Sequence, residues 1–260
     1  YSIQRDVLNR LLIEEAAQSP EIEIQFNAHC IEIQPKEGLA SFKIEGTTLP
    51  DVKSDLILGA DGLGSVVREV IAANEPGCSV KLSTFSHGYK ELTISAAAAQ
   101  KAQLRTDALH VWPRGTALIV ALPNPDQSFN CTFFWTLKGR DSFSSRDNPV
   151  DLREALQRDY PDLIPLLSDL EAQYSGVPSN PLRSLSCSAW ETEGKVLIIG
   201  DAAHAQLPFF GQGMNTAFED CLILSQLLKE KETLGEALQT YARARKPDTD
   251  AIALLSERNF

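Results

Sequence analysis

Two carboxylates each follow a short apolar run that has the length of a buried strand. Asp61 comes just after residues 56–59, and Asp201 comes just after 196–199. A carboxylate at this position can accept a hydrogen bond from a ribose hydroxyl or from the backbone N–H groups of the next helix. For Asp61 the role of a plain turn or helix-capping residue stays open. Small residues after Asp201 leave room for a ligand to approach the backbone.

A glycine-rich segment, Gly-Gln-Gly-Met-Asn at 211–215, precedes a helical pattern that begins near Thr216. Backbone N–H groups at the start of a helix face an anion or a polarised carbonyl, which suits a phosphate or the edge of a flavin ring. A glycine-rich turn without function is the alternative. Together with Asp201, this segment predicts half of a dinucleotide site at the carboxyl ends of the strands.

The other reactive side chains give weaker indications. His204 has the chemistry of a general base, but we interpret it as a structural residue beside a loop. Phe209 and Phe210 are adjacent and cannot both point into one core, so one of them is expected to face a pocket. The histidines and the five cysteines show no metal-ligand spacing, so no metal site is predicted. The scattered cysteines indicate reduced thiols.

Composition limits the partners. The chain has 260 residues and a net charge of −11, which argues against a nucleic-acid partner because phosphate binding needs a basic surface. No apolar run approaches the roughly 20 residues of a membrane span, and no signal peptide is visible. The chain starts at Tyr1 and stops at Phe260 within helical patterns, so we expect it to be part of a longer protein.

The periodicity predicts a mixed fold, α/β with α+β character, in which the two strand–turn–helix units share one sheet. Residues 81–136 read as antiparallel strands joined by Pro- and Gly-containing turns. The predicted domains are a first part of an α/β domain at 1–80, an inserted β-rich substrate domain at 81–181, and the second α/β part at 182–260. Helices are predicted at 3–17, 65–73, 150–160, 163–174, 218–228, 234–245 and from 248 onward, and short strands at 22–26, 31–33, 42–44 and 182–188.

The motifs carry a family resemblance. GDAAHAQLPFFGQGMN at 200–215, and ADG at 60–62 followed by Ser65 and Arg68, resemble the FAD-contacting motifs of the single-component aromatic flavoprotein monooxygenases. Within that class, HGYKELTI at 87–94, LHVWPRG at 109–115 and ALPNPDQSF at 121–129 resemble the kynurenine 3-monooxygenase family. The resemblance runs from Arg5 to Asn259.

The resemblance implies roles for particular residues. The cofactor-binding residues for FAD would be Arg5, Cys30, Asp61, Val66, Asp201, Gly213, Met214 and Asn215. The catalytic segment beside the flavin and the substrate ring would consist of Pro208, Phe209, Phe210 and Gln212. The substrate-binding residues would be Asn259, with Leu92, Ile94 and Val111 as an apolar wall.

The implied activity is a monooxygenase that uses FAD, NADPH and O₂ to hydroxylate an aromatic ring. L-kynurenine, converted to 3-hydroxykynurenine in tryptophan catabolism and NAD biosynthesis, is the first candidate substrate. A flavin hydroxylase of another aromatic acid and a non-catalytic flavin-binding relative are the alternatives. The family's glycine-rich βαβ unit, its substrate arginine and a C-terminal segment are missing from the chain. We therefore expect these 260 residues alone to be inactive and to bind FAD weakly or not at all. The family resemblance implies a cytoplasmic protein if bacterial and an outer mitochondrial membrane protein if eukaryotic; the oligomeric state is left open.

Overall fold

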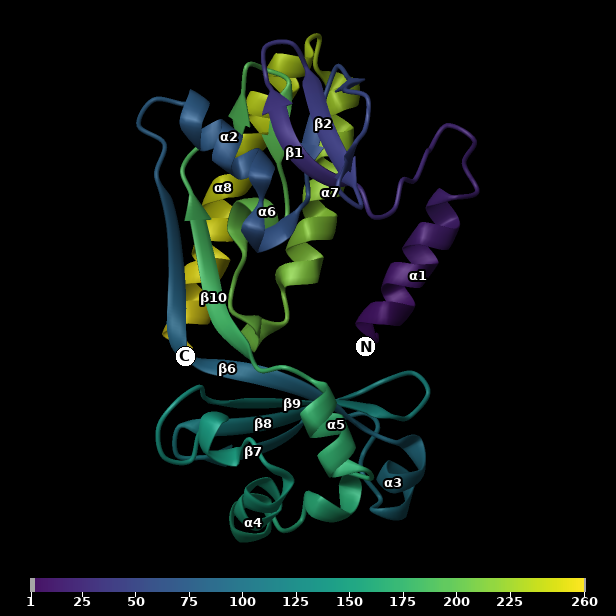
Figure 1. The fold of residues 1–260 in the computed structure, drawn as a ribbon, viewed down its shortest axis with the longest axis vertical. Coiled ribbons are helices and arrows are strands. Elements are labelled where there is room, and N and C mark those ends of the chain that lie inside the picture. Colours follow the sequence, from purple (N-terminus) through teal and green to yellow (C-terminus); the bar gives the residue numbers. More distant parts are fainter. Residues whose placement is uncertain (1–2, 260) are drawn as a thin grey trace. The chain divides into compact units, whose positions relative to one another are not determined.

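The computed structural model describes residues 3–259, which form two compact units (Figure 1). Unit 1 comprises Tyr1–Ile24 and Phe85–Leu182, and unit 2 comprises Gln25–Thr84 and Arg183–Phe260. Residue 260, the end of the closing helix expected from the sequence, lies outside the described residues. The mixed α/β fold class is confirmed. The three-part division at 1–80, 81–181 and 182–260 stays a prediction.

Unit 2 contains a small sheet in which two strands run parallel. Its order is β11-β12-β5, with β11 at Glu191–Thr192, β12 at Val196–Ile198 and β5 at Ile57–Gly59. Ile198 of β12 pairs with Gly59 of β5. The carboxyl ends of both strands therefore lie at the same edge, as expected for two strand–turn–helix units in one sheet.

A second sheet of unit 2 arises from a β-hairpin. It contains β1 (His29–Gln34), β2 (Leu39–Ile44), β3 (Thr47–Thr48) and β4 (Val52–Lys53), all antiparallel. Residues 22–25 belong to no helix or strand and pair with no described strand, so the prediction of a strand at 22–26 is wrong. Alternating side chains make a strand only where a partner backbone supplies the hydrogen bonds, and Ile22 and Phe26 stay at least half exposed.

Four helices of unit 2 follow the strands. They are α2 (Val66–Asn74), α6 (Asp201–His204), α7 (Gly213–Glu230) and α8 (Leu234–Arg258). The prediction of two separate helices at 234–245 and from 248 is wrong, because α8 continues through Pro247. Proline removes one backbone donor from a helix. Lys246 and Asp250 form an ion pair of 2.8 Å across this position, and Thr249 donates its hydroxyl to the Lys246 carbonyl.

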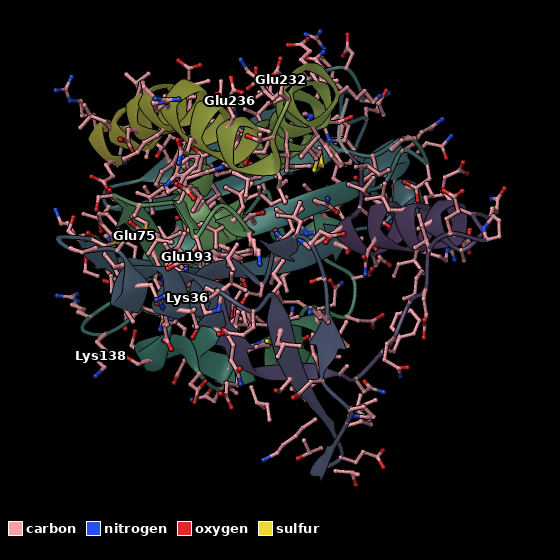
Figure 2. All side chains as sticks on the ribbon, turned by 90° about the horizontal axis from the view of Figure 1, so that it is seen from above. Lys36, Glu75, Lys138, Glu193, Glu232 and Glu236 are labelled. Atoms are coloured by element: carbon pink, nitrogen blue, oxygen red, sulfur yellow. The ribbon has the colours of Figure 1, made fainter. Side chains whose placement is uncertain are left out.

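The turn between β11 and β12 has charged residues beside it, of which Figure 2 labels Lys36, Glu75 and Glu193. Lys195 donates to the Lys36 carbonyl at 2.8 Å, and the Thr192 hydroxyl donates to Glu75. Burial, and then the negative charges of Glu75 and Glu193, raise the pKa of Glu191. These contacts join the hairpin of the second sheet and the end of α2 to the parallel sheet.

Unit 1 is built on an antiparallel sheet of order β10-β6-β9-β8-β7. Its strands are β7 (His110–Arg114), β8 (Ala117–Pro123), β9 (Phe129–Thr136) and parts of two longer strands, β6 (Val80–Ile94) and β10 (Asn180–Cys187). Residues 80–84 of β6 and 183–187 of β10 belong to unit 2. Its helices are α1 (Arg5–Ala16), α3 (Ala96–Lys101), α4 (Pro149–Asp159) and α5 (Leu170–Gly176). Side chains of α4 and α5 share one core with the inward-facing residues of β6, β8 and β9, and α1 has no buried residue (Figure 1).

The prediction of one helix at 163–174 is wrong. The segment forms a 3₁₀ turn at Ile164–Leu166 and then α5, with Leu167–Asp169 between them. Asp169 has φ 53°, the left-handed conformation, which interrupts a right-handed helix. The helix break expected at Pro161 is confirmed, since α4 ends at Asp159.

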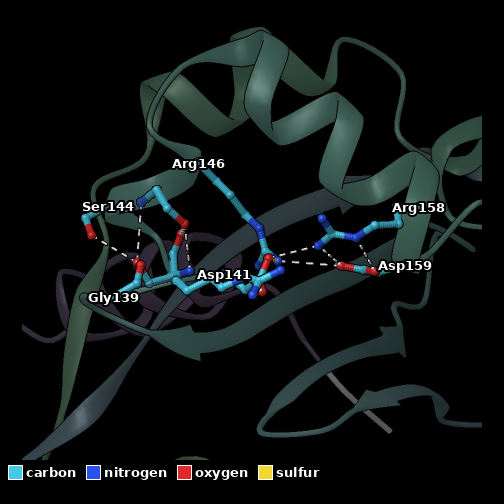
Figure 3. Close-up of polar contacts among 9 residues, drawn as sticks. Gly139, Asp141, Ser144, Arg146, Arg158 and Asp159 are labelled. Carbon is cyan, nitrogen blue, oxygen red and sulfur yellow. Dashed lines mark hydrogen bonds and ion pairs between the residues drawn. The ribbon is translucent and has the colours of Figure 1, made fainter.

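An arginine–aspartate network lies beside this core (Figure 3). Asp141 accepts from Arg146 at 3.2 Å and from Arg158 at 2.9 Å, while Asp159 accepts from Arg158 at 2.7 Å. The hydrogen bond from Arg158 is the main cause that lowers the pKa of both carboxyl groups. The guanidinium of the buried Arg146 lies 4.3 Å from the centroid of the Trp135 ring, a cation–π contact.

We expect Tyr174→Phe to change the free energy of unfolding by less than about 1 kcal/mol, because the buried hydroxyl has no hydrogen-bond partner among residues 3–259. Tyr174→Phe keeps both contacts with Lys90. The Lys90 ammonium lies 3.7 Å from the ring centroid, and it donates to the backbone carbonyl of residue 174 at 2.9 Å. Tyr174→Ala removes the ring and is expected to cost about 3–5 kcal/mol. Urea unfolding of both variants checks this, and a loss above 2 kcal/mol for Tyr174→Phe, roughly twice a typical hydrogen bond, would contradict it.

No helix within the described residues is long and apolar enough to cross a membrane.

Candidate functional site

Asp61 lies in the loop after β5 and caps the next helix. Its carboxylate accepts from the backbone N–H of Val66 at 2.8 Å, and the Ser65 hydroxyl accepts from the Arg68 N–H at 2.9 Å. These bonds satisfy donors that the first turn of α2 leaves without a helical partner. The hydrogen bond from Val66 supports the helix-capping role of Asp61, one of the two roles that the sequence left open. Val66 was assigned to the cofactor by resemblance, and its N–H donates to this carboxylate.

Arg68 joins the two loops that follow the parallel strands. Its side chain is buried, and it donates to the carbonyls of Gly62 at 3.3 Å and of Leu63 in the first loop. It also donates to the carbonyl of Ala202 at 2.9 Å, in α6 after the second strand. The loops that carry Asp61 and Asp201 are therefore held side by side by one guanidinium.

Asp201 is the first residue of α6 and its side chain is exposed. The preceding Gly200 has φ 57° and ψ −142°, a conformation open essentially to glycine alone. This turn directs the chain from the buried strand into a four-residue helix. Because that helix is too short to be stable by itself, the turn depends on tertiary contacts.

Those contacts come from a buried carboxylate on α7. Asp220 is 0% exposed, and one of its oxygens accepts from the Gly200 N–H at 2.9 Å and contacts His204 Nε2 at 2.6 Å. Its other oxygen accepts from Nε of Arg245, on α8, at 2.8 Å. His204, predicted to be structural, therefore lies in the core, where the Trp190 ring packs on it at a centroid distance of 5.3 Å.

The ionisation of Asp220 follows from its partners. Burial alone would raise its pKa, but hydrogen bonds from His204 and Arg245 and from Gly200 outweigh burial and the pKa is lowered. A carboxyl group whose pKa falls on folding stabilises the fold above its unfolded pKa, and that contribution is lost as the pH falls through the lowered value. Asp220 therefore stays ionised at neutral pH, and we expect its contribution to weaken only below about pH 4.

The glycine-rich segment forms the start of α7. Gly213, Met214 and Asn215 are its first three residues, and the Thr216 N–H is the first to reach back, to the Gln212 carbonyl at 2.8 Å. The first N–H groups of a helix have no acceptor within it. A Cβ built on Gly211, just before this turn, would meet no atom within 4 Å. Met214 and Asn215 are both exposed.

The aromatic segment before the glycines is a 3₁₀ turn, Pro208–Phe210. Phe210 is 47% exposed and Phe209 is half-buried, as expected if the two rings point in different directions. The Gln212 side chain donates to the Phe210 carbonyl at 3.1 Å and accepts from Asn215 at 3.1 Å. The turn contacts α8, and Asn259, predicted to bind substrate, is exposed at the end of that helix.

The remaining predicted residues lie elsewhere. Cys30 is half-buried in β1, and burial raises its pKa. Arg5 belongs to unit 1, where it lies 3.9 Å from Glu91 with both side chains exposed. Leu92 and Ile94 face the helix-covered core of unit 1, whereas Val111 is 47% exposed on the other face of the sheet. Since side chains alternate along a strand, these three residues do not form one apolar wall.

The sequence reasoning missed Asp220 and Arg245 as partners. A signal was present: Asp220 lies on the buried stripe of α7 with Thr216 and Leu224, and Arg245 on that of α8 with Tyr241. Opposite charges on the buried stripes of consecutive helices indicate an internal ion pair, because an unpaired charge is too costly to bury.

The site fits FAD in its donor chemistry. The N–H groups of Gly213–Asn215, which have no acceptor within α7, suit a phosphate or a polarised ring carbonyl, and no atom among the described residues crowds a Cβ position at Gly211. The exposed carboxylate of Asp201 can accept from a ribose hydroxyl. Among residues 3–259, no group of three or more His, Cys, Asp or Glu side chains is arranged to hold a metal ion.

The chain is similar in sequence to known flavin-dependent enzymes. The chain is 36% identical over 263 residues to kynurenine 3-monooxygenase of Salinispora arenicola (strain CNS-205), covering 100% of this chain and 57% of the relative. It is 37% identical over 262 residues to that of Flavobacterium psychrophilum (strain ATCC 49511 / DSM 21280 / CIP 103535 / JIP02/86), covering 100% and 58%. The resemblance stated from the motifs is confirmed, and the chain spans just over half the length of these relatives.

Solved structures share the fold. The tetrameric form of 2-methyl-3-hydroxypyridine-5-carboxylic acid oxygenase matches with a TM-score of 0.79 at 26% identity, covering 98% of this chain and 65% of the other. Klebsiella pneumoniae HpxO, complexed with FAD and uric acid, matches with a TM-score of 0.74 at 18% identity, covering 97% and 61%, a likeness of fold alone. The profile of a family described as FAD binding domain matches residues 2–254. The chain therefore belongs to the FAD binding domain family.

Proposed function

We propose that the protein containing this chain is an FAD- and NADPH-dependent monooxygenase that hydroxylates an aromatic ring, with L-kynurenine as substrate and 3-hydroxykynurenine as product. The observation that supports this most is the alignment of the whole chain, at 34–37% identity, with kynurenine 3-monooxygenases of several bacteria. The chemistry of the site supports it too. The segment at 208–215 offers backbone donors, two side-chain amides and two phenylalanines but no acid or base.

In this proposal the cofactor supplies the redox and oxygen chemistry, and the protein supplies binding, orientation and exclusion of water. Asp201 accepts from the ribose, and the N–H groups of Gly213–Asn215 face the edge of the ring. Pro208, Phe209, Phe210 and Gln212 lie beside the flavin and the aromatic substrate. Asn259 binds the substrate, and Arg5 contacts the cofactor.

The test is kynurenine-dependent NADPH oxidation by the complete protein loaded with FAD. Chromatography should show 3-hydroxykynurenine, with one oxygen atom from ¹⁸O₂. Asp201→Ala should raise the Kd for FAD roughly tenfold or more, because it removes a charge-assisted hydrogen bond. The resemblance to a pyridine-carboxylate oxygenase favours a second candidate, a hydroxylase of another aromatic acid. Stimulation by a hydroxybenzoate or a pyridine carboxylate but not by kynurenine would replace the first proposal with the second.

A further inference from the structure

We propose that Asp220 is a positioning residue, which holds the Gly200–Asp201 turn and the first turn of α7 at a fixed separation so that both reach the same FAD molecule. The inference rests on the proposed function, in which these two segments contact the cofactor. Asp220 itself has no exposed surface and lies in the core behind both segments. It therefore acts through the backbone rather than by touching the ligand.

The contacts of Asp220 fix both ends of α6. Its Oδ2 atom accepts from the Gly200 N–H at 2.9 Å, just before the helix, and contacts Nε2 of His204, the last residue of the helix, at 2.6 Å. Since the carboxylate is ionised and can only accept, Nε2 of His204 carries a proton. One oxygen thus anchors a four-residue turn that has too few hydrogen bonds to hold its own conformation.

Arg245 connects the same carboxylate to the start of α7. Its Nε donates to Oδ1 of Asp220 at 2.8 Å, and its Nη2 donates to the backbone carbonyl of Thr216 at 3.3 Å. Thr216 directly follows the three residues whose N–H groups have no helical acceptor. The Thr216 hydroxyl also bonds the carbonyls of Gln212 and Gly213, both at 2.9 Å. A chain of hydrogen bonds therefore runs from the Asp201 turn through Asp220 to the glycine-rich segment.

Charged and titratable side chains of α6, α7 and α8 lie around Asp220. Arg245 from α8 and His204 from α6 face it, and Glu219, 54% exposed, meets Nη1 of Arg245 at 2.7 Å. Tyr241 of α8 is buried nearby, and burial followed by the negative charge of Asp220 raises its pKa. Hydrogen bonds from a buried charge to fixed donors have strong directional preference, so this arrangement permits one position of the turn.

The variant Asp220→Asn tests the proposal with nearly unchanged volume. An asparagine amide presents one acceptor and one donor group, so at least one of the three donors that Asp220 accepts from now meets another donor. Glu219→Gln is the matched control, because it neutralises the neighbouring carboxylate that binds the same arginine but does not contact the turn. In the complete protein we expect Asp220→Asn to raise the Kd for FAD roughly ten- to a hundredfold, and Glu219→Gln to leave it within about twofold. The visible absorption bands of bound FAD should shift only in Asp220→Asn.

Amide hydrogen exchange in the flavin-free chain gives a second readout. We expect faster exchange in Asp220→Asn at residues 200–204 and 213–216, and no change in Glu219→Gln. If Asp220→Asn does not fold, a pair at His204 decides: His204→Gln keeps an N–H donor and should retain FAD affinity, whereas His204→Leu should lose it. Folded Asp220→Asn with the Kd, spectrum and exchange of Glu219→Gln would overturn the proposal. If the unsubstituted protein binds no FAD, the proposed function fails, and the exchange pattern alone decides whether Asp220 joins the two segments.

Discussion

Replacement of Arg68 by methionine is expected to lower the free energy of unfolding by about 3 kcal/mol or more, because three backbone carbonyls lose a charged donor. Two of them, at Gly62 and Leu63, lie after β5, and the third, at Ala202, lies after β12. Arg68 is 6% exposed and its bond to the Ala202 carbonyl is buried, so at that carbonyl water cannot replace the lost donor without disturbing the core. Methionine fills most of the volume but donates nothing.

Urea unfolding followed by circular dichroism measures this loss. The free energy of unfolding of Arg68→Lys should lie between those of the unsubstituted protein and Arg68→Met. An ammonium on one flexible stem cannot reach all three carbonyls as a planar guanidinium does. Arg105→Met is the control: its ion pair with Asp107 is exposed, with both side chains over 70% accessible, and should contribute less than about 0.5 kcal/mol. A loss below 1 kcal/mol for Arg68→Met, the value of a single ordinary hydrogen bond, would show that the loops do not depend on this tie.

The second large effect is expected at Gly59, the last residue of β5. A Cβ at this position would lie 2.6 Å from Cβ of Val67 and 2.8 Å from both of its methyl carbons. The Val67 Cβ is fixed to the backbone of α2, so the helix itself must move away from the strand. We expect Gly59→Ala to cost about 1–3 kcal/mol or more, the range for overpacked cores.

Thermal unfolding compares Gly59→Ala with Gly64→Ala, because a Cβ on Gly64 meets no atom within 4 Å. The control should change stability by less than about 0.5 kcal/mol. Adding Val67→Ala to Gly59→Ala removes the two methyl contacts and should restore part of the loss, although the Cβ–Cβ clash remains. Equal stability of the two glycine variants would mean that α2 does not pack against β5 at this distance.

The amino-acid sequence determined the local part of this structure. Apolar runs ending in small residues and a carboxylate predicted the strands before Asp61 and Asp201, and these pair in parallel in one sheet. The glycine-rich segment was predicted to precede a helix that begins near Thr216, and α7 begins three residues earlier, at Gly213 within that segment. Such signals depend on residues within a few positions of one another, and a pattern records them directly.

Only the tertiary structure decided the rest, because burial and pairing depend on residues far apart in the chain. Arg68 donates to the carbonyl of a residue 134 positions later in the chain, and Asp220 accepts from Arg245, which lies 25 positions later. The pattern at 22–26 found no partner strand, and alternation placed Leu92 and Val111 on opposite faces of one sheet. Residue types near Asp201 predicted the kind of ligand that the site would bind. Which buried side chains hold that turn in place was fixed when α7 and α8 packed behind it, since a buried charge is stable only where the fold brings its partners.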